Sequence, residues 1–132
     1  MVSRTESKHE KLLTKVELEL MMIVWALEDA TVRDVQERLP RERQLAYTTV
    51  ATMMKILEEK KILGSVKTDR THIYRARLSK EEYETKTLRQ LSEGLFRGNP
   101  TSMVMRLLNE SELNADELKE IKKLLDERLK SV

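Results

Sequence analysis

The sequence predicts a mainly helical protein with one small β-ribbon, and three observations lead to this fold class. Apolar residues recur at intervals of three and four along most of the 132 residues, which is the spacing of one helix face. Only three glycines and two prolines are present, which leaves little room for a β-rich fold. Alternating apolar and polar residues, the pattern of a strand, are confined to one stretch near residues 64–78.

The composition excludes several classes of protein. The chain has no cysteine, which rules out disulfides, thiolate zinc sites and a cysteine nucleophile. No apolar run approaches about 18 residues, and the polar start MVSRTESKHEK has no hydrophobic signal region. We therefore expect a cytoplasmic protein with no membrane partner, no cofactor and no enzymatic activity.

Two helices are predicted before residue 40. The segment TKVELELMMIVWAL begins with a capping-box pair, Thr14 and Glu17, and carries apolar residues on two faces. A helix that is apolar on two faces needs two packing partners. The segment ATVRDVQERLP gives a shorter helix with Thr31 as its N-cap, Asp34 at the capping-box position and Pro40 as its stop.

A third, longer helix lies within RQLAYTTVATMMKILEEKKIL, residues 43–63. On a helical wheel its apolar side consists of Val50, Met53, Met54 and Leu57. The opposite side carries Thr48, Thr52, Lys55 and Glu59, with Thr49 at the border. Because β-branched residues cost a few tenths of a kcal/mol in a helix, threonines on a face directed outward require an explanation.

The stretch GSVKTDRTHIYRARL predicts a two-stranded ribbon turning at TDRT. Its basic residues are Lys67, Arg70, Arg75 and Arg77. Two strands alone would be marginally stable, so the ribbon is expected to pack on the helices.

Residues 79–132 are predicted to form a helical tail. A capping box at SKEE opens one helix, Pro100 lies in the first turn of the next, and Asn114 caps the last. These helices carry apolar stripes that a segment this small can hardly bury alone, which favours a homodimer. The predicted dimerisation residues are Leu88, Leu91, Leu95, Val104, Leu107, Leu118, Ile121 and Leu125.

Helix, short helix, longer helix and basic ribbon, in this order, form a winged helix-turn-helix, whose third helix enters the major groove of DNA. Threonine lets the helix backbone sit close to the bases, and its methyl can pack on the thymine methyl. Segment 41–77 has nine basic and four acidic groups, and 43–57 has no acidic residue, which suits a surface that meets phosphate.

The fold is therefore predicted to be mainly α with a small β-wing, with a winged-helix DNA-binding domain at 1–78 and a helical dimerisation domain at 79–132. The predicted contacts to double-stranded DNA are Arg43, Tyr47, Thr48, Thr49, Thr52, Lys55, Lys67, Arg70 and Arg75.

The sequence leaves two alternatives to DNA binding open. The threonines could belong to a plain solvated helix face, and the whole chain could be a winged-helix adaptor that binds protein through its apolar tail. The acid-free face and the basic ribbon favour DNA, because an adaptor would need neither. His9 and His72 lack the neighbours of a zinc site, so no metal is expected.

The segments LTKVELELMMIVWAL, TVRDVQERL, AYTTVATMMKILEEKKIL and VKTDRTHIYRARLSKEEY resemble the penicillinase repressor family, the BlaI, MecI and CopY type of bacterial regulators. The similarity covers essentially the whole chain. It implies a homodimer with an N-terminal winged-helix domain and a C-terminal helical dimerisation domain. It also implies repression by occupation of a palindromic operator.

The chain departs from that family pattern in three places. Without cysteine it lacks the metal motif of the copper-responsive members. Arg106 and Leu107 stand where protease-regulated members carry an Asn-Phe bond, which argues against derepression by a regulatory protease and leaves these two residues as the candidate cleavage site. Lys60 and Lys61 replace the Lys-Gly that usually ends the third helix, so we expect its C-cap to be built differently, at Gly64.

Overall fold

The computed structural model describes residues 11–132; most of the polar start, His9 included, lies outside them. The chain divides into two compact units, one ending at Leu88 and one running from Arg89 to Val132. The sequence-based boundary at 78/79 therefore lies ten residues before the boundary between these units.

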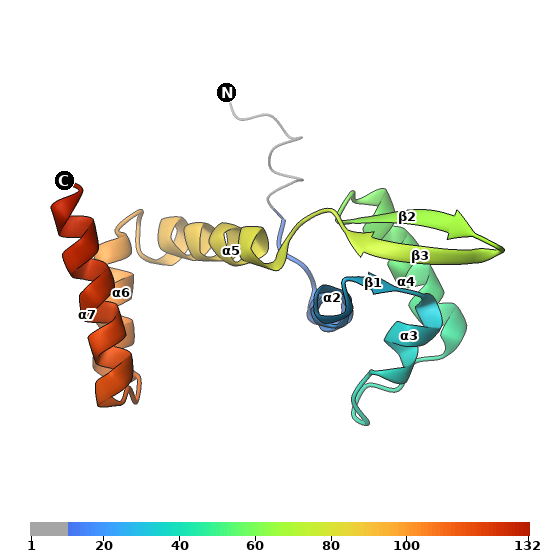
Figure 1. Ribbon diagram of the computed structural model, residues 1–132, viewed down its shortest axis with the longest axis horizontal. Helices are drawn as coiled ribbons and strands as arrows, with labels where there is room; N and C mark the ends of the chain where they lie inside the picture. The colour runs from blue at the N-terminus through green and yellow to red at the C-terminus, as the bar shows by residue number, and fades with distance from the viewer. Residues whose placement is uncertain (1–10) are drawn as a thin grey trace. The chain divides into compact units, whose positions relative to one another are not determined.

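The first unit is the predicted helical head with its ribbon (Figure 1). The mainly helical fold with a small β-wing is confirmed. Its elements, in chain order, are α2 (Lys15–Leu27), β1 (Asp29–Ala30), α3 (Val32–Glu37), α4 (Tyr47–Glu59), β2 (Leu63–Thr68), β3 (Thr71–Ala76) and the first part of α5 (Lys80–Leu95).

The ribbon is larger than predicted. β1 pairs antiparallel with β3, which gives a three-stranded sheet in the order β1-β3-β2. The expectation of two strands was wrong because a strand of two residues has no periodicity to detect. Its pairing places Asp29 opposite Arg75 and Ala30 opposite Tyr74, so the base of the ribbon is tied to the segment that follows α2.

The predicted helix starts agree with the structure. Reciprocal capping boxes join Thr14 to Glu17, Thr31 to Asp34, Ser79 to Glu82 and Asn114 to Glu117. In each box the first side chain accepts a backbone N–H three residues on, and the acidic side chain accepts the N–H of the cap. These four helices therefore begin at the residues that the sequence indicated.

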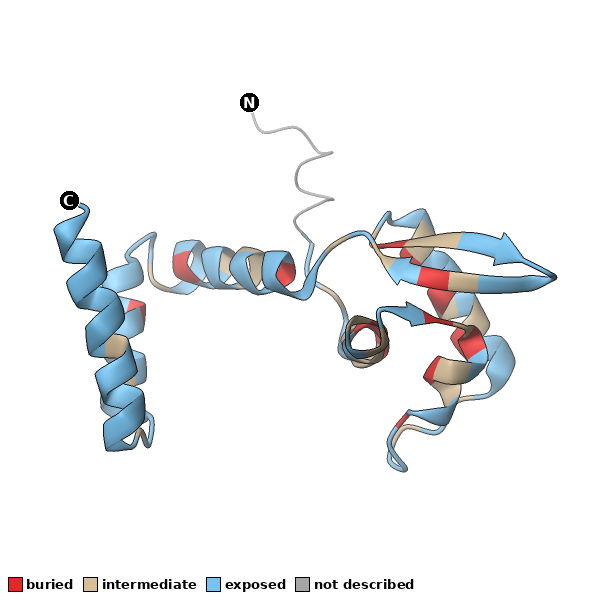
Figure 2. Ribbon diagram, in the orientation of Figure 1, coloured by how far each residue is buried: buried red, intermediate tan, exposed pale blue. Residues whose placement is uncertain are grey.

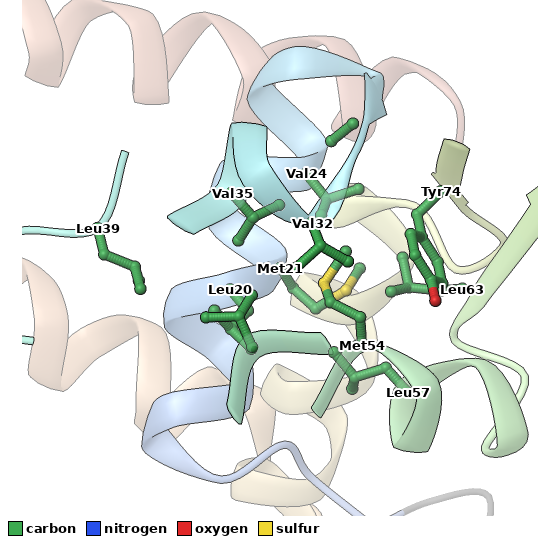
Figure 3. Packing of buried hydrophobic residues seen from close by; sticks show 12 residues of the cluster. Leu20, Met21, Val24, Val32, Val35, Leu39, Met54, Leu57, Leu63 and Tyr74 are labelled. Atoms are coloured by element: carbon green, nitrogen blue, oxygen red, sulfur yellow. The ribbon is translucent and has the colours of Figure 1, made fainter. Parts of the chain in front are cut away.

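The core of the head lies where α2, α3 and α4 meet the sheet (Figure 3). Its fully buried side chains are Leu20, Met21 and Val24 of α2, Val35 of α3, Val50, Met54 and Leu57 of α4, and Leu63 of β2. Tyr74 of β3 packs at the edge of this cluster with 4% of its surface exposed. On the apolar side of α4, Val50, Met54 and Leu57 are thus fully buried and Met53 is half-buried, whereas the opposite side is exposed.

The second apolar face of α2, Leu18, Met22 and Trp25, has a partner at Trp25, while Met22 stays 46% exposed. Trp25 lies on this face, its indole N–H donates to the carbonyl of Leu78 at 2.9 Å, and its ring centroid is 5.8 Å from that of Tyr83. The Tyr83 hydroxyl accepts the backbone N–H of Leu13 at 3.1 Å. The first turn of α5 is therefore packed on the head.

The end of α4 corrects one prediction. The N–H of Ile62 donates to the carbonyl of Leu57, and the N–H of Lys61 donates to that of Glu58, which is a Schellman motif. Lys61 occupies the left-handed position, with φ at 64°. The expected cap at Gly64 is wrong, since Gly64 lies within β2. The motif tolerates a lysine at this position at a cost in backbone strain.

The second unit contains the end of α5 and two further helices, α6 (Pro100–Glu110) and α7 (Ala115–Lys130). Pro100 is in the first turn of α6, as predicted, and Asn99 is its N-cap. Figure 2 shows almost no buried residue on these helices. Among residues 11–132, no helix is both long and apolar enough to cross a membrane.

Candidate nucleic-acid interface

The free side of α4 carries the predicted base-reading residues. Thr48, Thr49, Thr52 and Lys55 are exposed, and Tyr47 at the first helical position is 47% exposed. The Thr52 hydroxyl donates to the carbonyl of Thr48 at 2.9 Å, which leaves its oxygen able to accept and its methyl free. The face therefore presents short side chains with both polar and apolar character.

The N-terminus of α4 is open. Its N-cap, Ala46, offers no side-chain acceptor, so the N–H groups of the first turn have no capping partner. The guanidinium of Arg33, an exposed residue of α3, lies 6.0 Å from the centre of the Tyr47 ring. Arg33 is not among the contacts predicted from the sequence; its place in the first turn of the short helix, which crosses the DNA backbone in a helix-turn-helix, makes it a further candidate.

Arg43, in the turn between α3 and α4, is paired with Glu19 of α2. Its Nε lies 3.0 Å and 3.3 Å from the two carboxylate oxygens, and its Nη2 lies 3.2 Å from Oε1. These hydrogen bonds lower the pKa of Glu19 and raise that of Arg43. The predicted phosphate contact is thus a residue that already has a carboxylate partner.

A second ion pair fixes the other end of α4. Lys60 Nζ lies 2.7 Å from Oε2 of Glu17, whose side chain is only 7% exposed. Burial alone raises the pKa of Glu17, but hydrogen bonds from Lys60 and from the backbone of Thr14 outweigh it and leave the pKa below its ordinary value of 4.5. The end of α4 is therefore tied to α2 by this ion pair as well as by the core.

The tip of the wing is cationic and exposed. Asp69 and Arg70 have φ values of 46° and 71°, as in a type I′ turn, and Lys67 and Arg70 are exposed beside it. At the base, Arg75 is bound by Asp29, with Nε–Oδ1 at 2.6 Å and Nη2–Oδ2 at 3.0 Å. This pairing raises the pKa of Arg75 and lowers that of Asp29. Among the described residues, Lys67 and Arg70 at the tip of the wing therefore have no ion-pair partner, whereas Arg75 at its base has one.

The predicted dimerisation residues are mostly exposed on the single chain. All of them except Ile121, which is half-buried, are exposed, and Leu95 keeps 68% of its surface. Arg106 and Leu107, the candidate cleavage site, are exposed within the regular helix α6, where Arg106 lies 3.7 Å from Glu110. Residues 11–132 contain no group of three His, Cys, Asp or Glu side chains that could hold a metal ion.

Comparison with known proteins identifies a family for most of the chain. A family model described as "Penicillinase repressor" matches residues 13–127. A penicillinase repressor of Staphylococcus aureus is 20% identical over 115 residues, which cover 87% of this chain and 91% of that protein. The transcriptional regulator BlaI of Mycobacterium tuberculosis is 40% identical over 63 residues, 47% of this chain and 46% of that protein. Among solved structures, a CopR repressor is 29% identical and covers 50% of this chain and 96% of that one, with a TM-score of 0.44.

Proposed function

The chain belongs to the penicillinase repressor family, a family of DNA-binding transcriptional repressors, and we propose that it acts as a homodimer that occupies a palindromic operator. In this proposal the threonine face of α4 reads base edges in the major groove. The tip of the wing binds backbone phosphate, and the tail joins two heads.

The observation that carries the proposal is the exposed face of α4. Thr48, Thr49, Thr52 and Lys55 are all free on that face, and the nearest acidic residues on the helix, Glu58 and Glu59, are at its far end. A carboxylate near the groove would repel phosphate, and a long side chain would hold the helix away from the bases. The part of α4 that would meet DNA has no carboxylate, and positions 48, 49 and 52 carry short threonines, with the longer Lys55 after them.

The dimer is supported by the tail. Apolar side chains are exposed on α5, α6 and α7, and exposed apolar side chains of this kind are what obligate homodimers cover. A two-fold dimer would present two recognition helices to two half-sites, which is why the operator is expected to be palindromic.

The test is a gel shift of the full chain on its own upstream DNA and on random DNA of equal length. We expect Thr52→Ala to weaken operator binding by about 5- to 150-fold, the value of one good base contact, and to leave binding to random DNA nearly unchanged. Thr87→Ala is the matched control, because the Thr87 hydroxyl makes the same bond, to Tyr83 at 2.7 Å, but lies on α5. Equal losses on both DNAs would mean that Thr52 does not read sequence.

The adaptor hypothesis remains the alternative, since an exposed apolar tail would serve it equally well. It predicts no preference for any DNA and no effect of Thr52→Ala. If the full chain binds neither upstream nor random DNA at low salt, the adaptor hypothesis replaces the repressor.

A further inference from the structure

The Arg43–Glu19 pair uses only one edge of the guanidinium. Glu19 accepts from Nε and Nη2, the side edge of the group. A guanidinium has five N–H donors in a fixed plane, so three remain, two on Nη1 and one on Nη2. No other hydrogen bond joins these donors to the described part of the chain, and the Arg43 side chain keeps 32% of its surface exposed.

The turn that carries Arg43 does not need this ion pair to hold its shape. The N–H of Arg43 donates to the carbonyl of Pro40 at 2.9 Å, and the Gln44 side chain donates to the same carbonyl at 3.0 Å. Gln36 of α3 donates to the carbonyl of Leu45 at 3.2 Å, just before α4 begins. Glu19 therefore fixes the side chain of Arg43 and leaves the backbone to other bonds.

We infer that Glu19 is a positioning residue for DNA binding: it holds Arg43 by its side edge so that the free end edge, Nη1 and Nη2, is presented to a backbone phosphate beside the start of α4. This inference rests on the proposed function. A long arginine side chain loses rotamer freedom when it binds, and a carboxylate that has already fixed it lowers that loss. The free edge can then bind two phosphate oxygens as a fork.

The inference makes a prediction opposite in sign to that of simple electrostatics. Glu19 is a negative charge next to a proposed phosphate site, so its removal should tighten DNA binding if only net charge matters. If Glu19 positions Arg43, its removal should weaken binding instead. The isosteric substitution Glu19→Gln removes the charge and keeps the size of the side chain.

The experiment measures the affinity of the full chain for its upstream DNA across a series of salt concentrations. We expect Glu19→Gln to weaken binding by about two- to tenfold, the cost of immobilising one long side chain on binding. Glu42→Gln is the matched control: Glu42 is in the same turn, exposed, and without an ion pair among the described residues, so its loss should leave affinity unchanged or slightly higher. Arg43→Ala should lower the slope of log affinity against log salt by about one unit, which a purely structural role would not do.

The double variant separates the two roles of Glu19. In the Arg43→Ala background there is nothing left to position, so Glu19→Gln should no longer weaken binding. Thermal unfolding checks that each variant is folded. If the Glu19→Gln variant is unfolded, Arg43→Lys takes its place in the experiment. Lysine keeps the positive charge but has no second pair of N–H donors for phosphate, so Arg43→Lys should lose affinity as Arg43→Ala does.

The outcomes are distinguishable. Tighter binding by Glu19→Gln, an equal loss in both backgrounds, or an unchanged salt slope for Arg43→Ala would each overturn the positioning role while DNA binding stands. Failure of the unmodified chain to bind any DNA would overturn the proposed function, and this inference with it.

Discussion

The two units of the chain bury their apolar residues to very different extents. In the head, eight large side chains have less than 2% of their surface exposed, and they come from α2, α3, α4 and β2. In residues 89–132, all of which the structure describes, Met103 is the only buried hydrophobic residue, and Leu95, Leu107, Leu124 and Leu129 are each more than half exposed. Leu, Ile, Val and Met together make up a similar fraction of each unit. The contrast therefore comes from how the helices and strands are arranged.

The two units differ in whether a single chain can bury the apolar side chains of its own helices. The head closes on itself because a sheet, a short helix and two longer helices surround one cluster. The tail has amphipathic helices with no such enclosure in a single chain, and an exposed surface of this extent in water is unfavourable unless something covers it. We therefore expect the head to be stable as a monomer and the tail to depend on a second copy.

The largest expected effect is that of removing the tail. Truncation after Leu88 should leave a folded, monomeric head that binds one half-site, with affinity lower by about 10²- to 10⁴-fold because two linked modules no longer bind together. The cut is placed after Leu88 because Tyr83 packs on Trp25 and accepts from Leu13; a cut at residue 78 would remove both contacts. Sedimentation measures the oligomeric state, and a gel shift measures the affinity.

The control for this truncation is the full chain at micromolar concentration. If the full chain is monomeric there, the contrast between the units has been misread, and the palindromic-operator mechanism fails with the dimer.

Replacing one leucine by alanine in each unit should affect two different quantities, the free energy of unfolding in the head and the dimer dissociation constant in the tail. Leu57→Ala removes a fully buried side chain from the head and should lower the free energy of unfolding by about 2–5 kcal/mol, because it leaves a cavity. Leu125→Ala removes a side chain that is 52% exposed in the single chain, so its effect should appear as a higher dimer dissociation constant. Denaturation at two protein concentrations separates them: only the Leu125 variant should change its concentration dependence.

Much of this fold could be predicted from the sequence because its signals are local. Capping boxes such as Thr14 with Glu17, and the stripe of Val50, Met54 and Leu57, depend on residues three and four apart. β1 could not be predicted, since its two residues form a strand only through pairing with Arg75 and Tyr74, far along the chain. The packing of Tyr83 on the head could not be predicted for the same reason, because its partners Trp25 and Leu13 are remote in sequence.

The candidate interface was predicted less completely. Periodicity indicated that Thr48 and Thr52 face outward, but it said nothing of which cations are already paired. The structure pairs Arg43 with Glu19 and Arg75 with Asp29, over separations of 24 and 46 residues. Unpaired and paired cations look alike in a sequence, because their difference is set by tertiary contacts.

A smaller effect is expected from the ion pair that joins α2 to the end of α4. The pKa of Glu17 is lowered in the folded state, so its contribution to stability is present above its ordinary value of 4.5 and is lost as the pH falls below it. Glu17→Gln should cost about 1–2 kcal/mol at pH 7, since a nearly buried, charge-assisted hydrogen bond is replaced by a neutral one. The difference between the two proteins should shrink as the pH is lowered from 5 to 3, measured by urea denaturation of the head. A pH-independent difference would show that packing, and not charge, is responsible.

The smallest expected effect is a gain in stability, and it tests whether the head carries backbone strain at the end of α4. Lys61 holds a left-handed conformation with φ at 64° in the Schellman motif that ends α4, and its side chain is exposed. Lys61→Gly removes the steric cost of the Cβ, although glycine also loses more backbone entropy on folding, so the net gain should be about 0.5–1 kcal/mol. Glu59→Gly, two residues earlier in α4 at an ordinary helical position, is the matched control and should lose about as much. Thermal unfolding should therefore shift in opposite directions for these two variants, by a few degrees each, with no change in how the dimer responds to concentration. A loss of stability in both would mean that Lys61 is held in place by contacts worth more than the strain they impose.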